Sequence, residues 1–139
     1  MTQSSTSRSL RAFAGILVLT LSGLAAAEPP LGAARLGYIS GVVSFSPSSQ
    51  PDWVQAVVNR PLTTGDRLWA DSNSRAELQI GGASIRLGEL TDVALLNFDD
   101  RITQVQLLQG SLNVHVRRIG VSQSLEIDTP NLAFTLRQI

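Results

Sequence analysis

The sequence contains no cysteine and no lysine, and all eleven of its basic side chains are arginine. Without cysteine there are no disulfides, no thiol catalysis, no thiolate zinc site and no lipid-modified N-terminal cysteine. Without lysine there is neither Schiff-base chemistry nor the lysine of a phosphate-binding loop. The formal net charge is zero. A nucleic-acid binder normally carries a basic excess, so no nucleic-acid partner is expected.

Motifs that carry catalysis are also missing. We find no G-x-S-x-G, H-E-x-x-H or glycine-rich nucleotide-binding pattern. The only histidine, His115, lies on the polar phase of an alternating stretch and lacks the further ligands that zinc needs. The sequence therefore predicts a protein that is not an enzyme, with no catalytic residues, no cofactor and no metal site.

Acidic pairs offer two further candidates for chemistry. Asp99 and Asp100 lack the spaced oxygen ligands of a calcium loop. Asp66 and Asp71 flank a short apolar stretch, but a glycosidase pair would need a cleft between its two carboxyl groups. Turn formation explains all four residues, since aspartate accepts hydrogen bonds from neighbouring backbone N–H groups.

The first 27 residues are typical of a secretory signal. Arg8 and Arg11 precede an apolar run over 12–24, and three alanines ending at Ala27 form a small-residue cleavage site. An uncleaved anchor is the alternative, but a membrane span needs about 20 apolar residues. We expect an N-terminal signal helix, cleavage after Ala27 and no membrane span afterwards. The expected compartment is the periplasm of a Gram-negative bacterium, or more generally secretion.

From residue 28 onward, the pattern favours strands. Residues 28–35 are rich in proline and alanine and predict a flexible lead-in, and 36–139 predict one all-β domain. Alternation is clearest in Arg75–Ile80, where Ala76, Leu78 and Ile80 share one face. We expect extended stretches at 38–45, 53–58, 66–69, 75–80, 83–87, 93–98, 102–108, 111–116, 125–127 and 132–136.

Turn residues separate these stretches every eight to twelve residues or so, as in all-β domains. Strands of about five residues suit either a small sandwich or a stack of coils. Because no strict repeat is visible, the sequence favours a short, irregular β-solenoid or double-sheet roll. Within 102–108 we expect Val105 and Leu107 to face inward, and within 111–116 Leu112, Val114 and Val116.

A series of short motifs resembles the FecR domain, a periplasmic all-β module named after a regulator of iron-citrate uptake. The motifs are Leu62-x-x-Gly65-Asp66-x-Leu68, Ser74-Arg75-Ala76-Glu77-Leu78-x-Ile80, Ile85-Arg86-Leu87, Leu107-x-x-Gly110-x-Leu112-x-Val114 and Ile127-x-Thr129-Pro130. The resemblance runs from about Leu36 to the C-terminus. It implies a non-enzymatic module that receives or passes on a signal in the cell envelope.

Two features depart from the family. The iron regulators place a cytoplasmic anti-sigma segment and a membrane helix before the domain, whereas this chain begins with a secretion signal. It therefore resembles the stand-alone, secreted FecR-like proteins. The family also continues past the Thr-Pro turn into a further strand, whereas this sequence stops at Ile139. We expect a domain incomplete at its C-terminus, with an exposed sheet edge that favours pairing.

Three residues are the candidates for interaction: Trp53, Trp69 and Arg75. Tryptophan is favoured at binding hot spots, but a small β domain also uses it in the core. Arg75 belongs to a group of arginines, Arg60, Arg67, Arg75 and Arg86, that forms either a solvated face or a rim for a carboxylate-bearing partner. The first hypothesis is a binding module for an envelope protein. The alternative is a structural protein associated with cell-wall glycan or peptidoglycan.

Overall fold

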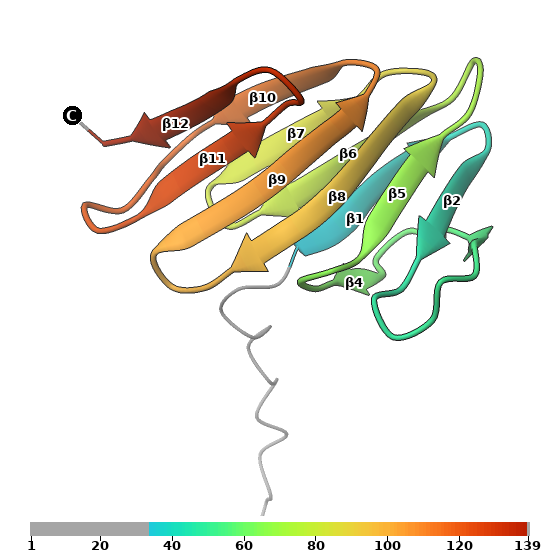
Figure 1. The fold of residues 1–139 in the computed structure, drawn as a ribbon, viewed down its shortest axis with the longest axis horizontal. Coiled ribbons are helices and arrows are strands. Elements are labelled where there is room, and N and C mark those ends of the chain that lie inside the picture. The colour runs from blue at the N-terminus through green and yellow to red at the C-terminus, as the bar shows by residue number, and fades with distance from the viewer. Residues whose placement is uncertain (1–33, 139) are drawn as a thin grey trace, which may run out of the picture.

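The structure, a computed structural model, describes residues 34–138, which form two β-sheets (Figure 1). The five-stranded sheet has the order β10 (Leu112–Val116), β7 (Ala83–Leu87), β6 (Arg75–Ile80), β1 (Ala34–Ser40) and β4 (Pro61–Leu62). The seven-stranded sheet has the order β12 (Ala133–Arg137), β11 (Ser124–Asp128), β9 (Ile102–Gln109), β8 (Thr91–Phe98), β5 (Arg67–Ala70), β2 (Val43–Ser46) and β3 (Val54–Gln55).

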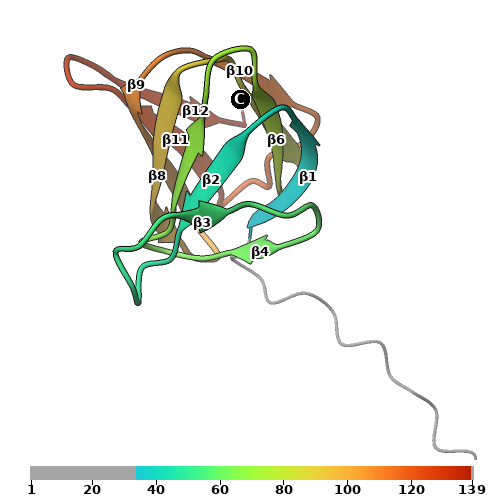
Figure 2. The ribbon, with the colours of Figure 1, turned by 90° about the vertical axis from the view of Figure 1, so that its right-hand side faces the viewer.

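The two sheets lie face to face, with β2, β8 and β11 on one side and β1 and β6 on the other (Figure 2). This arrangement confirms the all-β class and the two sheets of short strands. The strand pairs are antiparallel except β9 with β11, which is parallel. A solenoid of stacked coils is not confirmed by these pairings, because successive coils of a solenoid pair in parallel.

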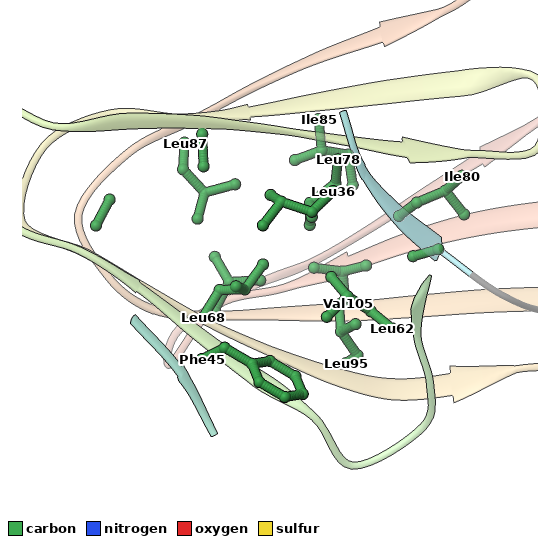
Figure 3. Close-up of a cluster of buried hydrophobic side chains, with 14 of the residues drawn as sticks. Leu36, Phe45, Leu62, Leu68, Leu78, Ile80, Ile85, Leu87, Leu95 and Val105 are labelled. Atoms are coloured by element: carbon green, nitrogen blue, oxygen red, sulfur yellow. The ribbon is translucent and has the colours of Figure 1, made fainter. Parts of the chain in front are cut away.

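The core lies between the sheets and follows from the alternation in the sequence (Figure 3). Its fully buried side chains include Leu36, Leu78 and Ile85 from one sheet and Leu68, Leu95 and Val105 from the other. The expected inward face of β6 is confirmed, since Ala76, Leu78 and Ile80 are buried. Removing such side chains from water is the main favourable term in folding.

The stretch 38–45, expected as one strand, is divided between the two sheets. β1 ends at Ser40, and β2 starts at Val43 in the opposite sheet. Gly41 forms the corner with a φ of 78°, a conformation that glycine adopts readily and other residues rarely do. A Cβ at this position would also overlap the hydroxyl of Ser74. The chain can therefore cross from one sheet to the other in two residues.

The segment between β2 and β5 contains less strand than expected. Only Val54–Gln55 of the stretch 53–58 is paired, as β3 on β2, and β4 adds Pro61–Leu62 beside β1. Proline is tolerated there because β4 is an edge strand and needs no ladder donor on its open side.

The N-terminal end of the described range bears on the boundaries expected from the sequence. β1 begins at Ala34, inside the segment expected to be a flexible lead-in. The expected signal helix and the cleavage site at Ala27 lie outside the described residues. Within residues 34–138, no helix is long and apolar enough to cross a membrane.

Candidate functional site

The outer face of the seven-stranded sheet carries Arg67 and Trp69. On β5, Leu68 and Ala70 are buried in the core, so the residues that alternate with them point outward. Asp92 of the neighbouring strand β8 lies directly across from Trp69 in the register. The Arg67 guanidinium donates a hydrogen bond from Nη2 to Asp92 Oδ2 at 2.5 Å. This ion pair fixes the direction of the Arg67 side chain.

Trp53 joins the same face from the segment that precedes β3. Its side chain is 44% exposed. The Arg67 guanidinium lies 5.4 Å from the centroid of its ring, within the range of a cation–π contact. We call Trp53, Arg67, Trp69 and Asp92 the tryptophan patch. It brings together two of the three residues predicted for interaction, although they are 16 positions apart in the sequence.

Arg75, the third candidate, lies on the other sheet. It is exposed at the start of β6, where it borders a shallow hollow of about 330 Å³. Exposed Tyr38 borders the same hollow, together with Glu77 and Arg86. Arg86 donates a hydrogen bond from Nε to Glu77 Oε2 at 2.7 Å. Arg75 therefore does not share a site with the two tryptophans.

The four arginines of the predicted rim are also divided. Arg75 and Arg86 lie on the five-stranded sheet, and Arg67 lies on the seven-stranded sheet. The Arg60 guanidinium lies 4.0 Å from the centroid of the Phe45 ring, over a core side chain. The arginines do not form one continuous rim, because β5 and β6 are consecutive strands that belong to different sheets.

The aspartates considered for hydrolysis serve turns. Asp66 is buried, and its two carboxylate oxygens accept hydrogen bonds from the N–H groups of Ser48 and Thr63, each at 2.9 Å. Asp71 Oδ1 accepts a hydrogen bond from the N–H of Ser72. Turn formation, the reading favoured from the sequence, therefore accounts for both side chains.

Asp99 has the same role between β8 and β9. Its Oδ1 accepts hydrogen bonds from the N–H groups of Ile102 and Arg101, each at 2.7 Å. These bonds, the one from Ile102 first, lower the pKa of the carboxyl group below its ordinary value of 3.8. Among residues 34–138 there is no group of three or more histidine, cysteine, aspartate or glutamate side chains arranged to hold a metal ion.

One end of the sandwich has a small hollow that sequence reasoning did not find. It has a volume of about 120 Å³ and lies where the turns after β6 and β8 meet the segment between β10 and β11. Gly82, Asp99, Arg118 and Gln123 are among its lining residues. The acidic turn Asp99-Asp100, Arg118 and the pair Gly81-Gly82 were all visible in the sequence. Only long-range strand pairing brings them together.

The edge strands β10 and β12 form a second feature that was only partly expected. The sequence predicted an exposed sheet edge, and β12 is an edge strand whose residues are all exposed. The residues Leu112, Val114 and Val116 of β10, expected to face inward, are half-buried and pack against the core. The adjacent arginines Arg117 and Arg118, which follow β10, are the sequence feature that could have marked this edge as a candidate site.

In comparisons with protein-family models, curated proteins and solved structures, nothing matches this chain. The resemblance to the FecR domain, read from the motifs, stays a prediction.

Proposed function

We propose that this chain is a non-enzymatic, FecR-like binding module of the periplasm, which docks an envelope protein and takes part in signalling. The observation that supports this most is the tryptophan patch. Trp53 remains 44% exposed on a sheet face, although the same domain offers an apolar interior. A rigid aromatic side chain held beside an arginine is the combination enriched at the centres of protein interfaces.

The patch has the features of a docking surface. The Arg67–Asp92 pair and the contact of Arg67 with Trp53 restrict the side chains before a partner arrives. Less side-chain entropy is then lost on binding, which raises affinity. Trp69, half-buried on β5, extends the aromatic surface by two residues along the strand, a distance of about 7 Å.

Site-specific photo-crosslinking in intact cells tests the proposal. A photoreactive side chain at Gln55, which is exposed on β3 two residues after Trp53, should give one specific protein adduct. Trp53→Ala and Trp69→Ala should each reduce that adduct, and the same probe at exposed Ser122 is the matched control. Equal labelling from Gln55 and Ser122, unaffected by the tryptophan changes, would contradict docking at this patch.

The alternative function is association with cell-wall glycan or peptidoglycan. It uses the same residue, because the exposed ring of Trp53 could also stack on a sugar. Soluble peptidoglycan fragments should then change the tryptophan fluorescence in a saturable way that Trp53→Ala removes. A protein-docking module should give no such change.

A further inference from the structure

The strands β10 and β12 lie at the same end of the two sheets (Figure 1), and β4 and β3 are the edge strands at the opposite end. β10 pairs only with β7, and β12 pairs only with β11. Each therefore presents one backbone edge without a strand partner among the described residues. Such an edge is a template for adding a further strand.

The hydrogen bonds that flank β10 identify the groups on its free edge. The Arg117 N–H donates to the Gly82 carbonyl at one end, and the Gly88 N–H donates to the Ser111 carbonyl at the other. In an antiparallel ladder the bonded residues alternate, so Asn113 and His115 also bond with β7. The backbone groups of the three apolar residues Leu112, Val114 and Val116 therefore point away from β7.

An apolar surface continues past this edge on the opposite sheet. Phe134 and Leu136 of β12 pair with Ile127 and Leu125 of β11, both of which are buried. Directly paired residues point to the same side of a sheet, so Phe134 and Leu136 belong to the inner face. They are nevertheless 54% and 39% exposed. A strand added beside β10 would face them and reduce that exposure.

One end of this region is strongly basic. Arg117, Arg118 and Arg137 line a hollow of about 310 Å³ between the end of β10 and the end of β12. None of them forms a salt bridge with an acidic side chain of the described residues. Neither edge strand brings an acid, because residues 110–118 and 130–138 contain no aspartate or glutamate. Pairing of either edge with β10 or β12 of a second copy would therefore leave the arginines without a counter-charge from the paired strands.

We propose that the β10 edge binds an extended segment of another protein, apolar at alternate positions and acidic at the end that meets Arg117 and Arg118. Backbone hydrogen bonds to Leu112, Val114 and Val116 supply affinity, and the apolar side chains cover the inner face beside Phe134. The arginines select the partner by charge. This inference rests on the proposed docking function and names a second contact for it, distinct from the tryptophan patch.

Binding of synthetic peptides to the full-length chain tests this inference. The probe is a ten-residue peptide, blocked at both ends, with valine and threonine alternating and two aspartates at the N-terminal end. A second peptide carries the aspartates at the C-terminal end, because a parallel strand would present that end to the arginines. A third carries lysine in place of aspartate. Fluorescence anisotropy should show saturable binding of one of the aspartate peptides and none of the lysine peptide.

Variants of the two edges distinguish strand addition at β10 from nonspecific binding of the peptide. Val114→Pro removes an N–H from the free edge of β10 and leaves the ladder to β7 intact, since that N–H does not bond β7. It should weaken peptide binding by at least about tenfold. Thr135→Pro on β12 is the matched control. The Thr129 N–H donates to the Leu132 carbonyl, so these two residues form a hydrogen-bonded pair between β11 and β12. Bonded pairs alternate along the ladder, so the Thr135 N–H lies on the free edge of β12. This control variant should change binding by less than about twofold.

A surface variant keeps the test informative if Val114→Pro does not fold. Arg117→Glu with Arg118→Glu should weaken binding of the aspartate peptide roughly fivefold and reduce its salt dependence. Failure of both aspartate peptides to bind, or equal binding by all these variants, would overturn the proposal. So would self-association of the chain that Val114→Pro abolishes, because the edge would then take a second copy. Crosslinking from Gln55 is read separately, so it can succeed where the peptides fail.

Discussion

The Arg67 guanidinium contacts both the ring of Trp53, at 5.4 Å from the centroid, and the carboxylate of Asp92, at 2.5 Å. Arg67 is thus held from two sides on the outer face of the seven-stranded sheet. The two partners come from segments 39 positions apart, so the patch forms only once β2, β3, β5 and β8 have paired. Of its residues, Trp53 is the exposed one, so its contribution to binding can be measured with little effect on stability.

Trp53→Ala should lower the free energy of unfolding by about 1 kcal/mol or less, because the residue is a surface side chain with one cation–π contact. Trp69→Ala should cost more, about 2 kcal/mol, because its side chain is half-buried on β5. Urea unfolding followed by circular dichroism measures both. A loss of about 3 kcal/mol or more for Trp53→Ala would show that this ring serves the core rather than a partner.

Gly41→Ala should destabilise the fold by about 2 kcal/mol or more, since a Cβ at positive φ is strained and here also meets Ser74. Gly81→Ala is the matched control. Gly81 also has a positive φ, of 53°, but nothing lies within 4 Å of an added Cβ, so only the backbone cost of about 1 kcal/mol remains. Equal losses for the two variants would contradict the close approach of Gly41 to Ser74.

Asp66→Ala should lower the free energy of unfolding by roughly 2 kcal/mol, because it leaves the N–H groups of Ser48 and Thr63 without their acceptor. Asp100→Ala, in an exposed turn, should stay within about 0.5 kcal/mol of the parent. Chemical denaturation of the two variants measures the difference. If Asp66→Ala were neutral, the role of this carboxylate in the turn would be wrong.

The strands of regular alternation could be predicted from the sequence. β6 and β7 begin and end where expected, because Arg75–Ile80 and Ala83–Leu87 alternate strictly and are joined by two glycines. The corner at Gly41 could not be predicted, since Ile39 on one side and Val42 and Val43 on the other favour strand equally. A single glycine in such a run also fits a bulge. What distinguishes a corner from a bulge is that Leu36 and Phe45, on either side of Gly41, are buried in opposite sheets.

The candidate site was predicted less well than the fold. Trp53 and Trp69 were singled out by residue type, and the pairing of β3 with β2 and of β2 with β5 brings their segments together. β3 and β4 have two residues each, too short to show a period. Arg75 was grouped with Arg67 on sequence proximity alone. The two lie on different sheets because the turn between β5 and β6 carries the chain across.

Asp99 gives the fold a pH dependence of known sign. Backbone N–H groups of Ile102 and Arg101 lower its pKa in the folded state, so the folded protein binds fewer protons than the unfolded chain in acid. The stabilisation is fully present above the unfolded pKa of about 4, and it is lost as the pH falls through the lower folded value. Asp99→Asn should therefore be less stable than the parent at neutral pH, and the difference should shrink below about pH 4. Thermal melts across pH 2–7 measure this, with Asp100→Asn as the control; a difference independent of pH would show that the charge on Asp99 plays no part in the turn.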